Sequence, residues 1–184
     1  MFMGDHAVTT ERVKFRTASV ADASVIVSMM TAGISKWVAS WPYPLSLHQA
    51  QTILKTVGKD VEAGQCHAFI ASKAEIGTDI GWLKIAKSDF GTSSWEIGYW
   101  IAEDHQGCGF AKDITRFALR FCFEELGAGQ VMAGAQVENE ISLNLLKKMG
   151  FRYSHYQEVF APARQRTEEC EYRLLDRCDW KVAD

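Results

Sequence analysis

Between residues 95 and 127 the spacing of hydrophobic positions changes from that of a strand to that of a helix. Residues 95–101 (WEIGYWI) are rich in aromatic and β-branched side chains and predict a buried strand. From Gly109 onward, apolar residues recur at helical spacing and predict an amphipathic helix that ends at Gly127. The apolar face of this helix comprises Phe110, Ile114, Phe117, Ala118 and Phe121. We therefore expect a strand, a loop and a long helix here.

The same two periodicities predict the other elements. Ser19, Ser46 and Asn139 are placed to cap helices over residues 19–30, 47–63 and 139–149. The order βααβββαβαββ predicts one α/β (α+β) domain over residues 12–180, preceded by a flexible segment over residues 1–11. We expect a mixed, mostly antiparallel sheet of about seven strands flanked by about four helices. The remaining predicted strands are residues 12–16, 67–72, 79–86, 130–137, 151–160 and 168–175.

The loop over residues 106–111 (QGCGFA) joins the predicted central strand to its helix. Glycines at a helix start let backbone N–H groups converge on an anion such as phosphate, but a plain tight turn needs the same small residues. The residues alone leave both interpretations open. A Walker A loop is excluded because no Lys-Ser or Lys-Thr follows the last glycine. A dinucleotide fingerprint is disfavoured because Lys112 stands where a third small residue is needed.

This loop matches the Q/R-x-x-G-x-G/A pattern of the GNAT superfamily of acetyl-CoA-dependent N-acetyltransferases, and two further segments strengthen the resemblance. Residues 96–101 (EIGYWI) resemble the strand before this loop in the RimJ/RimL-like branch, typified by ribosomal-protein N-acetyltransferases. Residues 139–151 (NEISLNLLKKMGF) resemble the second signature of that branch, and residues 41–44 (WPYP) followed by Ser46 also fit it. The resemblance spans residues 12–180 and implies the GNAT fold, whose order of elements agrees with the periodicity.

The resemblance implies acetyl-CoA as co-substrate. Its pyrophosphate is expected on backbone N–H groups of the loop, and its amide-rich arm along the end of the preceding strand. In this family the asparagine at position 139 lies near the co-substrate, although helix capping alone also accounts for an asparagine there. The expected co-substrate residues are Tyr99, Trp100, Ile101, Gln106, Gly107, Cys108, Gly109, Phe110, Ala111, Lys112 and Asn139.

Acetyl transfer to an amine needs a base near the amine and a proton for the departing thiolate. Glu96 is the candidate base, because burial in an apolar strand would raise its pKa and because some GNAT members place their base on the corresponding strand. A structural or solvent-facing glutamate is the alternative. Many GNAT enzymes use a tyrosine as the acid, but Leu146 occupies that position. The RimJ/RimL-like branch uses a serine that corresponds to Ser142, which is therefore the candidate acid, with a surface serine as the alternative.

The acceptor is expected to be a primary amine, either a protein N-terminus or a small molecule. Trp37, Trp41 and Trp82 are candidate walls of the acceptor pocket, because aromatic side chains suit many amines. A non-catalytic acyl-CoA-binding module on the same fold is the alternative function, since the acid tyrosine is missing. A homodimer is common in such families, but no residue pattern indicates one.

Composition and charge bear on the possible partners, on metal sites and on the location of the protein. The 184 residues carry a net charge of −3 without a basic stripe, which disfavours nucleic acid as a partner. The five cysteines are scattered and contain no C-x-x-C pair, so we expect reduced thiols, no metal site and a cytoplasmic location. No apolar run approaches membrane-spanning length, so no membrane partner is expected.

Cys108 departs from the family pattern, which often has Lys or Arg at this position. The loss of that charge is expected to weaken the attraction for phosphate. Thiols at helix N-termini are often reactive, so Cys108 is also a candidate modifiable thiol that bound co-substrate would shield.

Overall fold

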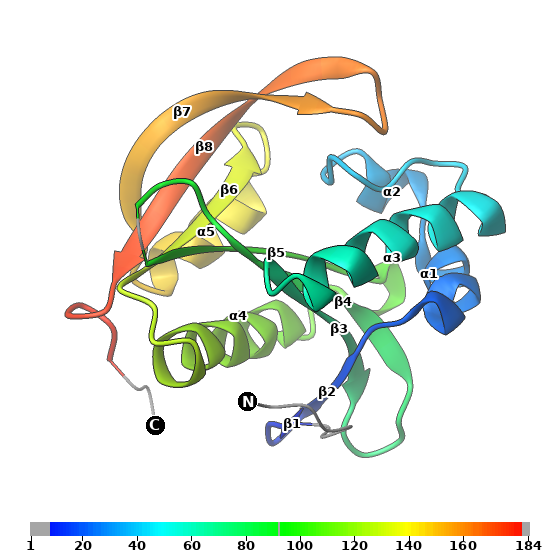
Figure 1. Cartoon of the computed structure of the whole chain (residues 1–184), viewed down its shortest axis with the longest axis horizontal. Helices are drawn as coiled ribbons and strands as arrows, with labels where there is room; N and C mark the ends of the chain where they lie inside the picture. Colours follow the sequence, from blue (N-terminus) through cyan, green and yellow to red (C-terminus); the bar gives the residue numbers. More distant parts are fainter. Residues whose placement is uncertain (1–7, 92, 182–184) are drawn as a thin grey trace.

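One sheet of eight strands runs through the computed structural model, which describes residues 8–91 and 93–181 (Figure 1). The strand order is β1-β2-β3-β4-β5-β6-β8-β7. Within this described sheet, β5 and β6 are parallel and all other neighbours are antiparallel. The strands are β1 (Val8–Thr9), β2 (Val13–Thr17), β3 (Cys66–Lys73), β4 (Asp79–Lys87), β5 (Ser94–Ile101), β6 (Gln130–Gln136), β7 (Arg152–Ala161) and β8 (Arg166–Asp176).

The predicted fold class, with its mixed and mostly antiparallel sheet, is confirmed, and every predicted strand is present. The two-residue strand β1 is additional and pairs with β2. It belongs to the segment expected to be flexible, of which residues 1–7 lie outside the described residues. β7 and β8 extend further than predicted because a short turn over residues 162–165 joins them, so that their ladder continues to Ala161 and Arg166.

Helices cover both faces of the sheet (Figure 1). The helices α1 (Ala23–Met29), α2 (Ala32–Ser35) and α3 (Leu47–Glu62) lie on one face, and α4 (Phe110–Arg120) lies on the other. The helix α5 (Glu140–Lys148) follows β6 and contributes Leu146 to the core on the α4 face. The two faces therefore have separate hydrophobic cores.

Side-chain caps determine where the helices on the first face begin. The Ser46 hydroxyl accepts from the Gln49 N–H at 3.2 Å, and the Gln49 side chain accepts from the Ser46 N–H at 2.9 Å, which starts α3 where it was predicted. The unpredicted helix α2 is a single turn whose cap is Thr31, which accepts from the N–H of Ile34 at 3.2 Å.

Two predicted helices change geometry at one end. The helix expected from Ser19 begins as a 3-10 turn (Val20–Asp22), because the Asp22 carboxylate accepts from the Ser19 N–H at 2.7 Å. The helix α4 continues as a π-helical turn (Phe121–Glu125) before Gly127, which has the expected left-handed conformation with φ 63°.

Alternation along β5 divides its side chains between the two cores. Ile97 and Ile101 pack in the core on the α4 face, where Phe15 also stacks on Phe117 with ring centroids 3.8 Å apart. Trp100 points the other way, into the core on the α1–α3 face. β5 is thus buried on both faces, as its sequence predicts.

Candidate active site

The parallel strands β5 and β6 separate after a short paired stretch. Residues 94–96 pair with residues 130–132. Beyond this point β5 remains bonded to β4, and β6 remains bonded to β8. In the described structure the facing edges of residues 97–101 and 133–136 therefore form no ladder with each other. Two open edges of this kind can hydrogen-bond an extended, amide-rich ligand arm.

Three of the predicted co-substrate residues lie on the open edge of β5. Trp100 and Ile101 are 5% and 7% exposed, and their side chains belong to opposite cores, so they offer only their backbone groups to the cleft. Tyr99 is half-buried against the core on the α4 face. The predicted role of these residues as a backbone platform is compatible with this arrangement.

The loop after β5 turns the chain into α4 through two left-handed glycines. Gly107 and Gly109 have φ values of 74° and 84°, which L side chains rarely adopt. Gln106 closes the loop by donating from Nε2 to the Ile101 carbonyl oxygen at 2.9 Å. Gly109 is the N-cap residue of α4, which begins at Phe110.

This loop presents backbone N–H groups that have no protein acceptor among the described residues. They belong to Gly107, Cys108, Gly109, Phe110 and Ala111. The first bonds of the helix run from the N–H groups of Lys112 and Asp113 to the Gly109 carbonyl, at 3.0 and 3.4 Å. Converging N–H groups at the positive end of a helix bind phosphates. The loop therefore fits a pyrophosphate group.

Glu96 lies where β5 and β6 part, opposite Met132 in the last pair of their ladder. Strand alternation puts Glu96 on the same face as Trp100, toward α1–α3, and Tyr99 on the face toward α4. The cleft between the unpaired edges of β5 (residues 97–101) and β6 (residues 133–136) thus has a carboxyl group on one side of the sheet and a phenol on the other.

Burial raises the pKa of the Glu96 carboxyl. The positive charge of Lys84 and hydrogen bonding with Tyr172 both act in the opposite direction, but they do not cancel the effect of burial. A carboxyl whose pKa is shifted upward is suited to accept a proton near neutral pH.

Glu96 opens into a cavity of about 150 Å³ between β6, β8 and the segment after α2. The predicted wall residue Trp37 lines this cavity, together with Glu168, Cys170 and Tyr172 from β8. The Tyr172 ring lies directly over Gly134 of β6, where an added Cβ atom would come within 2.8 Å of the ring. The close approach of Tyr172 therefore requires glycine at this position.

The charge of Glu168 is already compensated within the fold. Its carboxylate accepts hydrogen bonds from Arg164 at 2.8 and 2.5 Å, from Arg166 at 2.8 Å and from Gln136 at 2.7 Å. These contacts, led by the hydrogen bonds from Arg164, lower the pKa of Glu168 to about 2. Among the described residues, Glu96 is the carboxyl of this cavity that has no arginine partner.

The other two tryptophans predicted as pocket walls belong to the hydrophobic core. Trp41 and Trp82 are 4% and 3% exposed and pack edge-to-face with ring centroids 5.3 Å apart. Neither residue lines the cavity beside Glu96. Their aromatic rings fill the space between the sheet and α1–α3, a packing role that composition does not distinguish from ligand contact.

The N-terminus of α5 brings Asn139 and Ser142 to the α4 side of the sheet. Asn139 caps this helix, because its Oδ1 accepts from the Ser142 N–H at 3.2 Å. Burial raises the pKa of the Tyr99 phenol, while hydrogen bonding with Thr115 and Ser142 acts against that rise. Ser142 therefore lies beside a phenol that comes from β5. Leu146 is 1% exposed in the core.

The contribution of β8 to the cavity was not predicted from the sequence. Glu168, Cys170 and Tyr172 alternate along the strand, so they share one face. This alternation was a visible signal, but the register that pairs Tyr172 with Gly134 and Cys170 with Gln136 was not. A carboxylate and a phenol therefore reach the cavity from a strand to which the sequence assigned no site residue.

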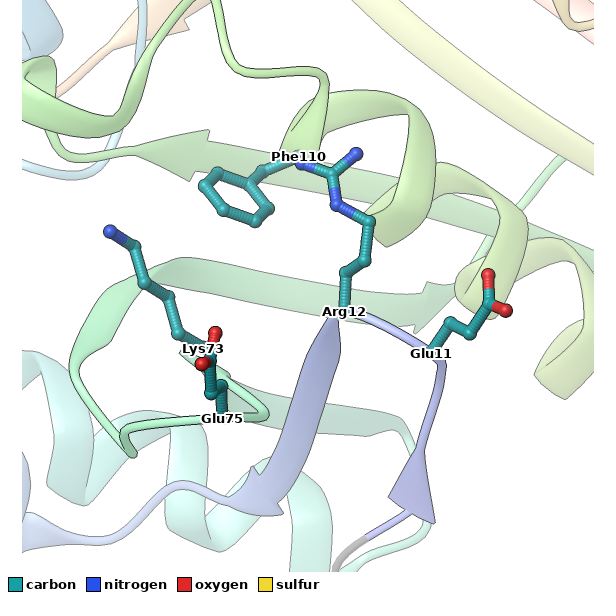
Figure 2. A pocket seen from close by; sticks show the side chains of 5 residues that line it. All are labelled: Glu11, Arg12, Lys73, Glu75 and Phe110. Atoms are coloured by element: carbon teal, nitrogen blue, oxygen red, sulfur yellow. The ribbon is translucent and has the colours of Figure 1, made fainter.

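A second hollow, of about 170 Å³, lies at the start of α4 (Figure 2). It is lined by Glu11, Arg12, Lys73, Glu75 and Phe110.

Across residues 8–91 and 93–181, no three His, Cys, Asp or Glu side chains are grouped to hold a metal ion. The part of the chain that the structure describes contains no helix long and apolar enough to cross a membrane.

Comparison with known proteins agrees with this geometry. The Bacillus subtilis (strain 168) protein named "Putative ribosomal N-acetyltransferase YdaF" is 33% identical over 146 residues, covering 77% of this chain and 78% of the relative. The ribosomal-protein-S5-alanine acetyltransferase from Vibrio fischeri superimposes with a TM-score of 0.78 at 16% identity, covering 96% of this chain and 100% of that chain. A chimera of the spermidine N-acetyltransferase SpeG from Vibrio cholerae and hSSAT gives a TM-score of 0.73 at 19% identity, covering 90% and 96% of the two chains.

Residues 12–152 match the family described as "Acetyltransferase (GNAT) domain". GNAT acetyltransferases use acetyl-CoA as co-substrate, and the free N–H groups of residues 107–111 are compatible with a pyrophosphate such as that molecule carries. The resemblance identified in the sequence is confirmed: this chain belongs to the GNAT family of acetyltransferases.

Proposed function

We propose that this protein transfers the acetyl group of acetyl-CoA directly to a primary amine, with Glu96 as the base and Ser142 as the acid. One observation carries the proposal: Glu96 stands at the point where β5 and β6 separate, in the wall of a cavity. Burial raises its pKa, and none of the ion pairs among the described residues includes it. A proton acceptor at the mouth of the cleft is what amine activation requires.

The amine enters from the α1–α3 face, because the cavity beside Glu96 lies there. A primary amine is mostly protonated in neutral water and must lose a proton before its nitrogen can attack. Glu96 accepts that proton, directly or through a water molecule. The amine nitrogen forms a bond to the thioester carbonyl carbon, and the carbon–sulfur bond breaks. The second proton that the nitrogen loses passes through water to Ser142, where it replaces the proton that Ser142 gives to the thiolate.

The co-substrate side of the reaction lies on the α4 face. The N–H groups of residues 107–111 hold the pyrophosphate, and the open edge of β5 hydrogen-bonds the arm. The Ser142 hydroxyl donates a proton to the departing thiolate, and the Tyr99 phenol beside it orients that hydroxyl. The amine binds from the α1–α3 face and acetyl-CoA binds from the α4 face. The amine nitrogen and the thioester therefore meet in the gap between β5 and β6.

The cavity favours a compact acceptor with one positive charge. Its volume is about 150 Å³, and the Glu168 carboxylate is already paired with arginines, so that Glu96 is left for the ammonium group. A polyamine carries further charges that would need further carboxylates. We therefore infer that a protein N-terminus beginning with a small residue is a better acceptor than spermidine.

The proposal is tested by calorimetric titration with acetyl-CoA, followed by measurement of free-thiol release with peptides that begin with Ala or Ser. Spermidine is the competing acceptor, and the same peptides with acetylated N-termini are the control. Thiol release with the free peptides alone is the expected result. Release with spermidine alone would reassign the acceptor. Binding without release from any amine would favour the non-catalytic acyl-CoA-binding module, and no binding would overturn the proposal.

A further inference from the structure

The phosphate-binding loop carries little positive charge of its own. Cys108 is neutral, and the first turn of α4 contains Lys112 and Asp113, whose charges are opposite. A pyrophosphate needs cations as well as N–H groups for tight binding in water. The positive charge that a pyrophosphate needs must therefore come from outside the loop.

Arg12 brings a guanidinium to this loop from a distant part of the sequence. It precedes β2, and its Nη2 donates to the Cys108 carbonyl oxygen at 2.7 Å, across 96 residues of chain. Its Nη1 lies 3.3 Å from the Asp113 carboxylate and 3.4 Å from the point where a Cβ atom on Gly109 would stand. The two contacts, with the Cys108 carbonyl and the Asp113 carboxylate, hold the guanidinium beside the loop.

Aromatic contact holds Arg12 in the same position. Figure 2 shows its side chain reaching from the start of β2 toward Phe110 and the first turn of α4. The guanidinium carbon is 4.8 Å from the centre of the Phe110 ring, and the Lys73 ammonium is 5.9 Å from the same ring. Two cations therefore flank the residue that begins α4.

The ion pair between Arg12 and Asp113 involves a buried carboxylate oxygen and therefore differs from an ordinary surface ion pair. Asp113 lies in the first turn of α4, and its buried Oδ2, which accepts no hydrogen bond from the described residues, is the atom that lies 3.3 Å from Arg12 Nη1. A carboxylate here would repel a phosphate at the same helix end. Arg12 offsets that charge, while its side chain stays half exposed and has N–H groups left to donate.

We propose that Arg12 is the cation of the co-substrate site and contacts the pyrophosphate of acetyl-CoA. The proposal rests on the proposed function, because it concerns the same loop. Arg12 neutralises Asp113 and adds charge-assisted hydrogen bonds to those of the loop N–H groups. Binding is then weakened by salt, as expected of a phosphate contact.

The test compares the acetyl-CoA affinities of wild type, Arg12→Gln and the double variant Arg12→Gln/Cys108→Arg by calorimetry. Arg12→Gln is expected to raise Kd about tenfold or more, with a flatter dependence on salt. The double variant, which places a positive charge in the loop at position 108, is expected to recover most of that loss in affinity. Arg120→Gln removes the same charge from the other end of α4 and should leave Kd unchanged.

A phosphate-free probe separates a charge contact from a packing role. S-Acetylpantetheine lacks the pyrophosphate, so wild type and Arg12→Gln should use it equally in thiol release. An unchanged Kd for acetyl-CoA in Arg12→Gln would overturn the inference, as would a double variant no better than Arg12→Gln. Either result would leave the proposed function intact as long as wild type binds acetyl-CoA. Wild type that fails to bind would overturn both.

Discussion

Glu96 and Tyr99 lie on the same strand but face opposite sides of the sheet, at the point where β5 has left its parallel partner β6. This relationship organises the proposed reaction. The carboxyl group faces the cavity on the α1–α3 side, and the phenol faces Ser142 on the α4 side. Proton acceptance and proton donation are thus separated by the thickness of one strand, and the gap between β5 and β6 connects them.

Replacement of Glu96 by Gln tests the base. We expect the rate of acetyl transfer to fall about 100-fold or more, because a general base contributes on that scale. The Kd for acetyl-CoA should not change, since the loop lies on the other side of the strand. Glu124→Gln is the matched control, because Glu124 is a surface carboxylate paired with Arg120. Equal rates for Glu96→Gln and wild type would rule Glu96 out as the base.

The same variant has a stability readout whose sign follows from the pKa. The pKa of Glu96 is raised in the fold, so the folded state holds this proton more tightly than the unfolded chain. The resulting contribution to stability is present below the unfolded pKa and is lost as pH rises through the folded pKa. Glu96→Gln should therefore gain stability relative to wild type as pH rises, measured by thermal unfolding at pH 5 and pH 8. A loss of stability at pH 8 would show that the ionised carboxylate is structural.

Lys84 provides a test of the pH dependence of the rate. Its positive charge lowers the pKa of Glu96, so Lys84→Met should raise that pKa further. Since the base must be ionised, the acidic limb of the kcat/KM profile is expected to move to higher pH, with the plateau rate little changed. Lys87→Met is the control, because Lys87 is an exposed residue of the same strand. A limb that moves equally in both variants would show that the shift does not report on Glu96.

Most of the fold could be predicted because its signals are local. The helix predicted over residues 47–63 was found as α3 within one residue, since the capping box of Ser46 and Gln49 lies within four consecutive residues. The helix α2 and the π-helical turn after α4 were not predicted. Each is a single turn, too short to establish a periodicity.

The candidate site divides in the same way. The loop over residues 106–111 was found because its motif is continuous in the sequence. Tyr172 was not found, because its position over Gly134 depends on the register of two strands. Arg12 was not found either, because its contact with Cys108 spans 96 residues. A residue that is brought to a site only by tertiary structure belongs to no local sequence pattern, so it cannot be predicted from residue spacing.

Gly134 offers a test of the cavity that leaves every charged group in place. An added Cβ atom would come within 2.8 Å of the Tyr172 ring, which is also stacked on His155 at a centroid distance of 5.2 Å. Gly134→Ala should therefore cost about 1–3 kcal/mol in the free energy of unfolding and should slow turnover by displacing Tyr172 from Glu96.

Gly58→Ala is the matched control for Gly134→Ala, because Gly58 lies within α3 with no atom within 4 Å of an added Cβ. This substitution should stabilise the protein by about 0.5–1 kcal/mol and leave turnover unchanged. Chemical denaturation and thiol release measure the two effects. If Gly134→Ala were as stable and as active as Gly58→Ala, the Tyr172 ring would not occupy the position described.

Tyr99 and Ser142 should act as one unit in proton donation. The Tyr99 phenol lies beside Ser142, so removal of either hydroxyl disturbs the same pair of groups. We expect Ser142→Ala and Tyr99→Phe each to lower kcat, and the double variant to lower it no further than Ser142→Ala alone. Additive losses would show two independent roles. Ser28→Ala, which removes an exposed hydroxyl from α1, is the control for Ser142→Ala.

Cys108 can report on occupancy of the loop without any substitution. Its thiol is exposed beside the unpaired N–H groups, whereas Cys66 and Cys122 are buried. Acetyl-CoA bound at this loop would cover Cys108, so it should slow alkylation of this thiol by N-ethylmaleimide, measured by peptide mass spectrometry. Cys178 is the internal control, since it is also exposed, in the turn after β8. Protection of Cys108 alone would locate the co-substrate on the loop. An alkylation rate of Cys108 that saturating acetyl-CoA does not change would mean that the phosphates bind elsewhere, and the roles given to Arg12 and to the loop N–H groups would then fall together.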